Sequence, residues 1–304
     1  MLLVLAAAVT IPLGLDLYLP VPEENPFTAD KIELGRRLFF DRRLSRDNSI
    51  ACSSCHRPEL AFSDGRPVAV GVFNRPGRRN SPALVNRGYG RVFFWDGRAA
   101  TLEEQVLKPI QDANEMDMTV PEAAARVGLP AEEISRALAS YVRSILFGDS
   151  PFDRFLNGDR AALSDEQQAG LEIFRGKGNC IACHVGPNFT DERLHNTGVA
   201  WREGNLSDLG GGKGDFKTPT LREVARTAPY MHDGSIATLE EVVEYYDRGG
   251  NRNPELDPEL RALHLSTAEK RNLAVFLRSL SAHSIENGRE LLFGTFRMLA
   301  SYWQ

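Results

Sequence analysis

Apolar residues recur every three or four positions over much of this chain, which is the spacing of amphipathic helices. Thr101 and Thr238 each precede a leucine and paired glutamates, and Ser164 and Thr267 precede acidic or amide side chains, as residues that cap helix starts do. We therefore expect a mainly α-helical protein with little strand. The helical spacing is found at residues 28–40, 121–127, 131–146, 164–174 and 267–280.

Two long segments, residues 65–91 and 186–219, lack this spacing and are rich in glycine, proline and asparagine. Loops of this length are uncommon in a compact domain unless they wrap around something. A large flat cofactor would account for both.

The two halves of the chain resemble each other. Residues 96–104 (DGRAATLEE) match residues 233–241 (DGSIATLEE) at an offset of 137, which also pairs Pro82 with Pro219. Such self-similarity indicates duplication of one structural unit. We expect an export signal or N-terminal arm at 1–22, a first domain at 23–150 and a second at 151–304. The boundary falls where glycine and proline interrupt residues 147–159.

The charges change this picture little. The 304 residues have a formal net charge of -5, and both signs are interspersed without a basic block, which argues against nucleic acid as the main partner. Residues 1–9 are apolar with alanines that suit a cleavage site, but Asp16 ends the run well short of a membrane-spanning length. Membrane association could therefore come only through this segment. The alternative to an export signal is an arm that packs on the first domain.

All four cysteines lie in two copies of Cys-x-x-Cys-His, which is the attachment motif of c-type haem. The two thiols form thioethers to the porphyrin, and the histidine becomes an axial ligand of the iron. A zinc site would bring its second cysteine pair closer in sequence, and a redox dithiol needs no adjacent histidine. Four cysteines are also too few to staple so long a chain with disulfides. The sequence thus predicts two covalent haems, on Cys52, Cys55 and His56 and on Cys180, Cys183 and His184.

The repeat also addresses the other face of each haem. Under the 137 offset, Pro109 in the first half corresponds to Tyr246 in the second. Proline cannot bind iron, whereas a tyrosine phenolate can. The duplication therefore predicts an open first haem and a second haem closed by Tyr246. The alternative is that Tyr246 is only a half-buried aromatic residue, and Tyr245, about 100° round the helix, is its nearest competitor.

Several blocks in order then resemble the bacterial di-haem cytochrome c peroxidase superfamily over about residues 25–281. This resemblance implies two cytochrome c-like domains, with hydrogen peroxide reduced at the first haem and electrons drawn through the second. The blocks are residues 52–56, Phe94-Trp95-Asp96-Gly97-Arg98-Ala99, Leu102-Glu103-Glu104-Gln105, Asn114-Glu115-Met116 and Ala228-Pro229-Tyr230-Met231-His232-Asp233-Gly234.

The chain departs from ordinary members at two positions. Val72 stands sixteen residues after His56, where those peroxidases have a distal histidine that must leave before activity, and Tyr246 stands where they have methionine. Both departures resemble the MauG-like branch, with a His/Tyr haem beside a permanently open one. Alternatives are Met231 as the ligand, as in an ordinary peroxidase, or a non-enzymatic electron carrier with both haems closed, which would need a ligand at Val72 or Pro109.

The resemblance also assigns roles around the haems. Glu115 resembles the distal acid that moves a proton between the peroxide oxygens, and Gln105 resembles the pocket amide one turn before Pro109. Trp95 resembles the tryptophan between the haems. Without the resemblance, Glu115 would be a solvated loop carboxylate and Trp95 a core aromatic. A structural calcium is implied by the side chain of Asn80 and the carbonyls of Thr227 and Pro229.

The expected partners are hydrogen peroxide and either a small electron-donor protein or a protein substrate oxidised over distance. The member of the branch that matures methylamine dehydrogenase has a surface tryptophan six residues before the second ligating histidine. Gly178 occupies that position here, which makes that substrate doubtful; Trp201 and Trp303 are other candidates. A periplasmic location is expected, because bacteria attach haem c outside the cytoplasm. His232, paired with Trp95 by the repeat, is expected to be structural, and His195, His264 and His283 have no supporting pattern.

Overall fold

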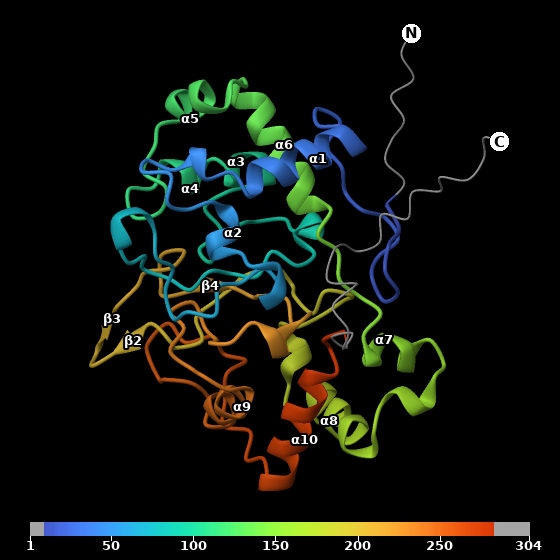
Figure 1. Ribbon diagram of the computed structural model, residues 1–304. Helices are drawn as coiled ribbons and strands as arrows, with labels where there is room; N and C mark the ends of the chain where they lie inside the picture. The colour runs from blue at the N-terminus through green and yellow to red at the C-terminus, as the bar shows by residue number, and fades with distance from the viewer. Residues whose placement is uncertain (1–8, 283–304) are drawn as a thin grey trace, which may run out of the picture.

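The computed structural model describes residues 9–282 and is mostly helical, with a few two-residue strands (Figure 1). The predicted fold class is confirmed. The helices are α1 Ala29–Phe39, α2 Cys52–Cys55, α3 Leu102–Gln105, α4 Lys108–Gln111, α5 Val120–Val127, α6 Ala131–Arg143, α7 Pro151–Leu156, α8 Asp165–Arg175, α9 Leu239–Asp247 and α10 Thr267–Arg278. Strand β1 Leu194–His195 pairs antiparallel with β4 Phe216–Lys217, and β2 Trp201–Arg202 pairs with β3 Asn205–Leu206.

Each half is built on one pair of crossing helices, α1 with α6 and α8 with α10. The helices approach so closely that a glycine is required at each crossing. A Cβ on Gly35 would lie 1.9 Å from the carbonyl oxygen of Ala137, and one on Gly170 would lie 2.1 Å from that of Asn272. The two glycines and their two contacts are related by one offset of 135, so the crossing is repeated.

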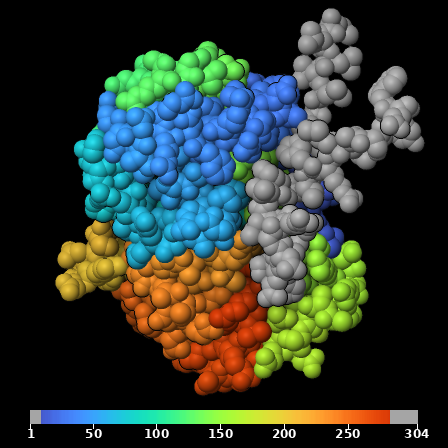
Figure 2. Space-filling view, viewed as in Figure 1, coloured from blue at the N-terminus to red at the C-terminus, as the bar shows by residue number. Residues whose placement is uncertain are grey.

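Two separate apolar clusters form the core. The first is drawn from residues 27–145 and the second from residues 152–280. Phe39 packs edge-on against Tyr141 in the first, and Phe174 packs against Phe276 in the second. Figure 1 shows the corresponding upper and lower lobes, and Figure 2 shows them as filled volumes with the β2–β3 hairpin projecting at one side. The division into two domains near residue 150 stays a prediction.

The 137-residue repeat is visible in the backbone. Phe93 forms an isolated antiparallel bridge with Ala99, and Tyr230 forms the equivalent bridge with Ile236. The glycines inside these turns, Gly97 and Gly234, have φ of +71° and +63°. These left-handed values favour glycine, which explains why the Asp-Gly pair occurs in both halves.

The turns lead into the helices that face the centre of the molecule. The Thr101 hydroxyl accepts from the amide of Glu104, and the Thr238 hydroxyl accepts from that of Glu241, so both predicted caps are confirmed. The Ser164 cap is also confirmed, but the prediction for Thr267 is wrong by one residue: Ser266 caps α10 and exchanges bonds with Glu269.

Proline makes the two central helices differ. In the second half α9 runs unbroken through Tyr246, whereas the equivalent stretch of the first half is divided into α3 and α4. Pro109 lies in the first turn of α4, because its missing N–H is tolerated only where no intrahelical bond is due. Proline at position 109, where the second half has Tyr246, thus removes a side chain that could bind iron and also shortens the helix.

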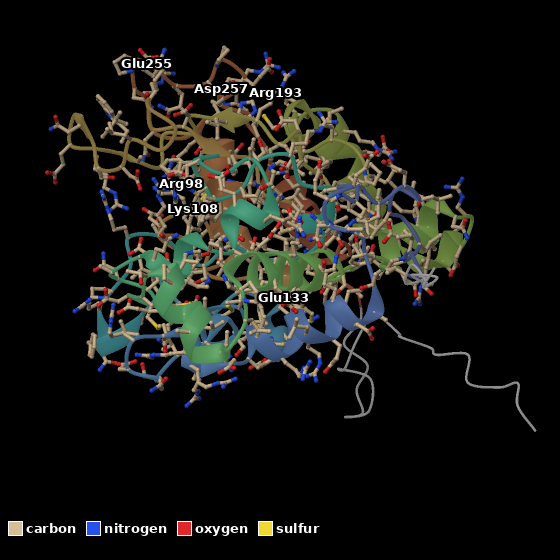
Figure 3. The ribbon with its side chains drawn as sticks, turned by 90° about the horizontal axis from the view of Figure 1, so that it is seen from above. Arg98, Lys108, Glu133, Arg193, Glu255 and Asp257 are labelled. Carbon is tan, nitrogen blue, oxygen red and sulfur yellow. The ribbon has the colours of Figure 1, made fainter. Side chains whose placement is uncertain are left out.

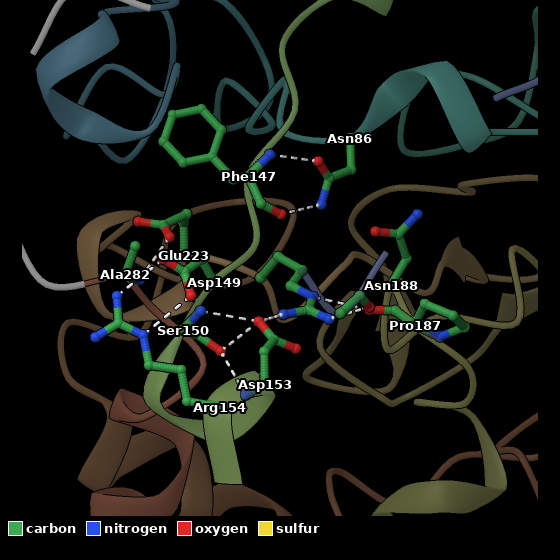
Figure 4. Close-up of polar contacts among 12 residues, drawn as sticks. Asn86, Phe147, Asp149, Ser150, Asp153, Arg154, Pro187, Asn188, Glu223 and Ala282 are labelled. Carbon is green, nitrogen blue, oxygen red and sulfur yellow. Dashed lines mark hydrogen bonds and ion pairs between the residues drawn. The ribbon is translucent and has the colours of Figure 1, made fainter. Parts of the chain in front are cut away.

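Polar contacts fix the junction between the halves (Figure 4). The side-chain amide of Asn86 bonds both the N–H and the carbonyl of Phe147, at 2.7 and 2.9 Å. Arg222 pairs with Asp153 at 2.5 Å, and their side chains are only 2% and 1% exposed. Asp153 also accepts from the amide and hydroxyl of Ser150, which caps α7. The chain therefore passes between the halves through a buried, charged joint.

The described part of the N-terminal segment lies across this joint. The carbonyl of Leu13 accepts from the amide of Asp149, and that of Gly14 accepts from Arg222, both at 2.8 Å. The carbonyl of Asp16 accepts from the hydroxyl of Tyr89. Residues 13–16 thus contact both halves, while the export signal stays a prediction. Within residues 9–282, no helix has the length and apolar character to cross a bilayer.

Charged side chains of both signs are spread over the described surface. Figure 3 shows Glu133 from α6 on one side and Arg193, Glu255 and Asp257 from loops of the second half on the other. This mixed surface agrees with the modest net charge of -5.

Loss of the buried pair at the joint should destabilise the protein strongly. We expect Asp153→Ala to lower the free energy of unfolding by about 3 to 5 kcal/mol, because Arg222 would stay buried without its counter-charge. Urea denaturation followed by circular dichroism measures this. Arg154→Ala is the control, since its pair with Asp149 is half exposed and is worth about 0 to 1 kcal/mol. Equal losses in the two variants would mean that the buried pair does not hold the joint.

Candidate active site

A cavity of about 600 Å³ lies between the two halves and is lined by both cysteine motifs. Cys55 and His56 face it from the first half, and Cys180, Cys183 and His184 from the second. Cys52 instead packs against the first apolar cluster. The structure therefore brings together, in one space, two motifs that are 128 residues apart in the chain.

Both motif histidines are oriented in the same way. Nδ1 of His56 lies 3.0 Å from the carbonyl oxygen of Phe62, and Nδ1 of His184 lies 2.8 Å from that of Phe189. A neutral ring that donates from Nδ1 leaves the lone pair of Nε2 free for a metal. Burial lowers the pKa of both rings and so favours the neutral form. These contacts fit two axial haem ligands.

The cysteines fit thioethers better than thiolates. Burial raises the pKa of Cys52, Cys55 and Cys180 to about 12, so a charged sulfur would be unfavourable at each. A zinc site or a redox dithiol needs thiolates. An uncharged thioether suits such surroundings.

Residues that are equivalent under the repeat line the same cavity from the two halves. Gln105 and Pro109 line it from the first half, and their partners at the 137 offset, Val242 and Tyr246, line it from the second. The predicted correspondence of Pro109 with Tyr246 therefore refers to two positions that face the same cavity.

The two adjacent tyrosines are clearly different. The hydroxyl of Tyr245 donates to the carbonyl of Thr197 at 2.8 Å and accepts from the amide of Asn251 at 3.3 Å. Tyr245 is buried in these contacts and does not line the cavity, whereas Tyr246 does. Burial raises the pKa of Tyr246, and only a nearby cation would reverse that preference.

Glu115 lines the first half of the cavity on a loop that is well anchored. Its carbonyl accepts from the amide of Val72 at 2.8 Å, and its amide donates to the carbonyl of Asp112. Arg75 holds the same loop through the carbonyl of Ala113 at 2.7 Å. Burial, with a smaller contribution from the charge of Asp112, raises the pKa of Glu115 to about 7. The carboxyl can therefore hold or release a proton near neutral pH.

Trp95 contacts both halves. Its indole N–H donates to the carbonyl of Asn80 at 2.9 Å, and its own carbonyl accepts from the amide of Lys217 at 2.7 Å. The side-chain amide nitrogen of Asn80 donates to the carbonyl of Arg66. This leaves the Asn80 amide oxygen as an acceptor in the cavity wall, which Thr227 and Pro229 also line.

Other predicted residues have clear surroundings. His232 is buried and stacks on Phe216, with 3.6 Å between ring centres, and burial lowers its pKa to about 4. Met231 lines the cavity and so remains a possible competitor of Tyr246. A Cβ on Gly178 would lie 2.8 Å from the carbonyl oxygen of Ile173, so a larger side chain would have to displace backbone. Trp201 is half buried on β2, and Trp303 and His283 lie outside the described residues.

Sequence reasoning missed His195. Its two ring nitrogens contact Asp257 at 2.5 Å and Asp191 at 2.9 Å. The neighbouring Cys183 sulfur and these two carboxylates raise the pKa of His195 above its usual value. Asp191 lies four residues before His195, but Asp257 lies 62 residues after it, so these three residues give no motif that could have been read from the sequence.

Comparisons with known proteins identify the family of this chain. The family profile for di-haem cytochrome c peroxidase matches residues 29–161. The methylamine utilization protein MauG of Methylorubrum extorquens is 38% identical over 86% of this chain and 81% of its own length. The cytochrome-c peroxidase IdrP2 of Denitromonas iodatirespirans is 36% identical over 87% and 85%.

Among solved structures, a MauG-like protein associated with microbial copper homeostasis superposes with a TM-score of 0.79. It is 32% identical and covers 88% of this chain and 94% of its own. Identity at this level over most of the chain is sufficient to assign the family. The chain belongs to the di-haem cytochrome c peroxidases, a family with two c-type haems, and is an oxidoreductase of the peroxidase class.

Proposed function

We propose that this protein reduces hydrogen peroxide at a first haem, held by Cys52, Cys55 and His56, and draws electrons through a second haem. Cys180, Cys183 and His184 hold the second haem, with Tyr246 as its sixth ligand. The observation that carries the proposal is the difference between Pro109 and Tyr246 at equivalent places in one cavity. This is the MauG-like arrangement.

The first haem is open to peroxide without rearrangement. Val72 stands where an ordinary member of the family has its distal histidine, and Val72 is fully buried with its amide bound to the Glu115 loop. No residue needs to leave before peroxide can bind. Activity in the fully oxidised protein follows from this arrangement.

Proton movement is the task of Glu115. The haem would supply the iron chemistry that splits the O–O bond of the peroxide. Glu115 takes a proton from one peroxide oxygen and returns it to the other, which leaves as water. Gln105 lines the same pocket as a neutral hydrogen-bonding side chain. One peroxide, two electrons and two protons give two waters.

The two electrons come from a second protein, either a small electron donor or a protein substrate whose side chain is oxidised. Trp95 contacts both halves and is suited to carry charge between the haems. A calcium ion at the Asn80 side chain and the Thr227 and Pro229 carbonyls would hold this centre together. Gly178 provides no aromatic relay, so methylamine dehydrogenase is not the proposed substrate. The proposed location is the periplasm.

Removal of the Tyr246 hydroxyl tests the asymmetry. We expect Tyr246→Phe to change the low-spin ferric signal of one haem in electron paramagnetic resonance, while the high-spin signal of the other persists. Tyr245→Phe is the matched control, because Tyr245 does not line the cavity and its hydroxyl donates to the Thr197 carbonyl. An unchanged Tyr246→Phe spectrum, together with a changed Met231→Leu spectrum, would transfer the ligand role to Met231.

Glu115 should set the pH dependence of peroxide reduction. The carboxylate is the active base and the pKa of Glu115 is about 7, so kcat/KM should rise as pH increases through neutrality. Glu115→Gln should lower kcat/KM by about 10²- to 10⁴-fold and abolish this rise. Stopped-flow kinetics measure both effects. Glu133→Gln, on the exposed face of α6, is the control, and a variant at Glu115 with the wild-type pH profile would reject the role.

A further inference from the structure

The two halves meet through a pair of equivalent hydrogen bonds. The amide of Asn80 donates to the carbonyl of His232 at 2.7 Å, and the amide of Lys217 donates to the carbonyl of Trp95, also at 2.7 Å. The 137 offset relates Asn80 to Lys217 and Trp95 to His232. Exchange of the halves therefore turns one bond into the other, as a local two-fold axis does.

This symmetry gives the side chains of Asn80 and Lys217 equivalent places. Both residues line the cavity, one in each half. Asn80 presents an amide oxygen, which suits a bound cation, whereas Lys217 presents a cation of its own. The two halves thus differ in how they would place positive charge at this position.

Within residues 9–282, the Lys217 ammonium has fewer hydrogen-bond partners than its three donors could use. Its side chain is only 9% exposed, and among residues 9–282 it donates one hydrogen bond, to the carbonyl of Thr218 at 3.1 Å. An ammonium group has three donors. The nearest carboxylate oxygen, on Glu192, lies 3.8 Å away, beyond hydrogen-bond distance.

Glu192 is already matched by another cation. It accepts two bonds from Arg87, at 2.7 and 3.0 Å, and a third from the amide of Arg91. Asp191, which also faces Lys217, is bonded to His195 at 2.9 Å. Two buried cations, Arg87 and Lys217, therefore share the single carboxylate of Glu192.

A buried ammonium with unmet donors is unfavourable. Burial, reinforced by the charge of Arg87, lowers the pKa of Lys217 to about 7. An anion that entered the cavity beside Lys217 would restore both the charge balance and the hydrogen bonds. Each haem carries two propionate carboxylates into this cavity.

We infer that Lys217, in the second half, binds a haem propionate. Its ammonium provides the positive charge that the proposed calcium ion provides at the equivalent residue Asn80 in the first half. This inference rests on the proposed function for the presence of the haems. A fixed positive charge next to a haem favours the added electron of the reduced iron. Lys217 therefore raises the reduction potential of the haem whose propionate it holds.

The test is a potentiometric titration of the holoprotein, followed by its visible spectrum. We expect Lys217→Gln to lower the reduction equilibrium constant of one haem about tenfold, equal to about 59 mV for a one-electron couple, with the other haem little changed. Lys217→Arg keeps the charge and should stay near the wild type. Lys213→Gln is the control, because that lysine is 70% exposed and paired with Glu255.

Unchanged potentials in a Lys217→Gln protein that retains both haems would overturn the inference. A crystal structure of the wild-type holoprotein provides a second test that needs no variant. Lys217 Nζ within hydrogen-bond distance of a propionate oxygen would support the inference, and contacts to protein atoms alone would refute it. The proposed function is tested separately. Absence of the haems or of peroxide turnover would contradict it, and neither result depends on these potentials.

Discussion

The reciprocal hydrogen bonds between Asn80 and His232 and between Lys217 and Trp95 determine how the two halves face each other. Because they are related by the repeat, they place equivalent residues of each half on opposite walls of one cavity. The cavity then contains both cysteine motifs, although each half has its own apolar cluster. Two cysteine motifs in one space follow from this interface.

The two halves differ chemically because some equivalent positions have different residues. Pro109 and Tyr246 differ in their ability to bind iron, and the proline also divides the helix that stays whole in the second half. Trp95 and His232 also differ: the indole donates to the Asn80 carbonyl within the first half, while the imidazole stacks on Phe216. Duplication supplies two matched positions, and in the proposed function a few side chains make one a site for substrate and the other a closed site.

Local patterns in the sequence predicted what depends on local contacts. Helical spacing and capping residues predicted the longer helices to within a few residues, with the cap of α10 misplaced by one residue. The short helices α2 and α7 and the break before Pro109 were not predicted. The internal repeat was found because its turns need the same Asp-Gly pair. His195 and Lys217 were missed because their surroundings come from residues far apart in the chain, such as Asp257 and Arg87. No spacing rule reports a contact between two loops.

One physical cause, burial, acts on five titratable groups that line the cavity. It favours neutral His56 and His184, raises the pKa of Glu115 to about 7 and that of Tyr246 further, and lowers that of Lys217 to about 7. In the protein alone, burial therefore favours the neutral forms of these five groups. A haem introduces both missing charges, the positive iron and the negative propionates. In the proposed function, Tyr246 binds the positive iron and Lys217 binds a negative propionate. Haem binding therefore favours the charged forms of these two side chains, whereas burial alone favours their neutral forms.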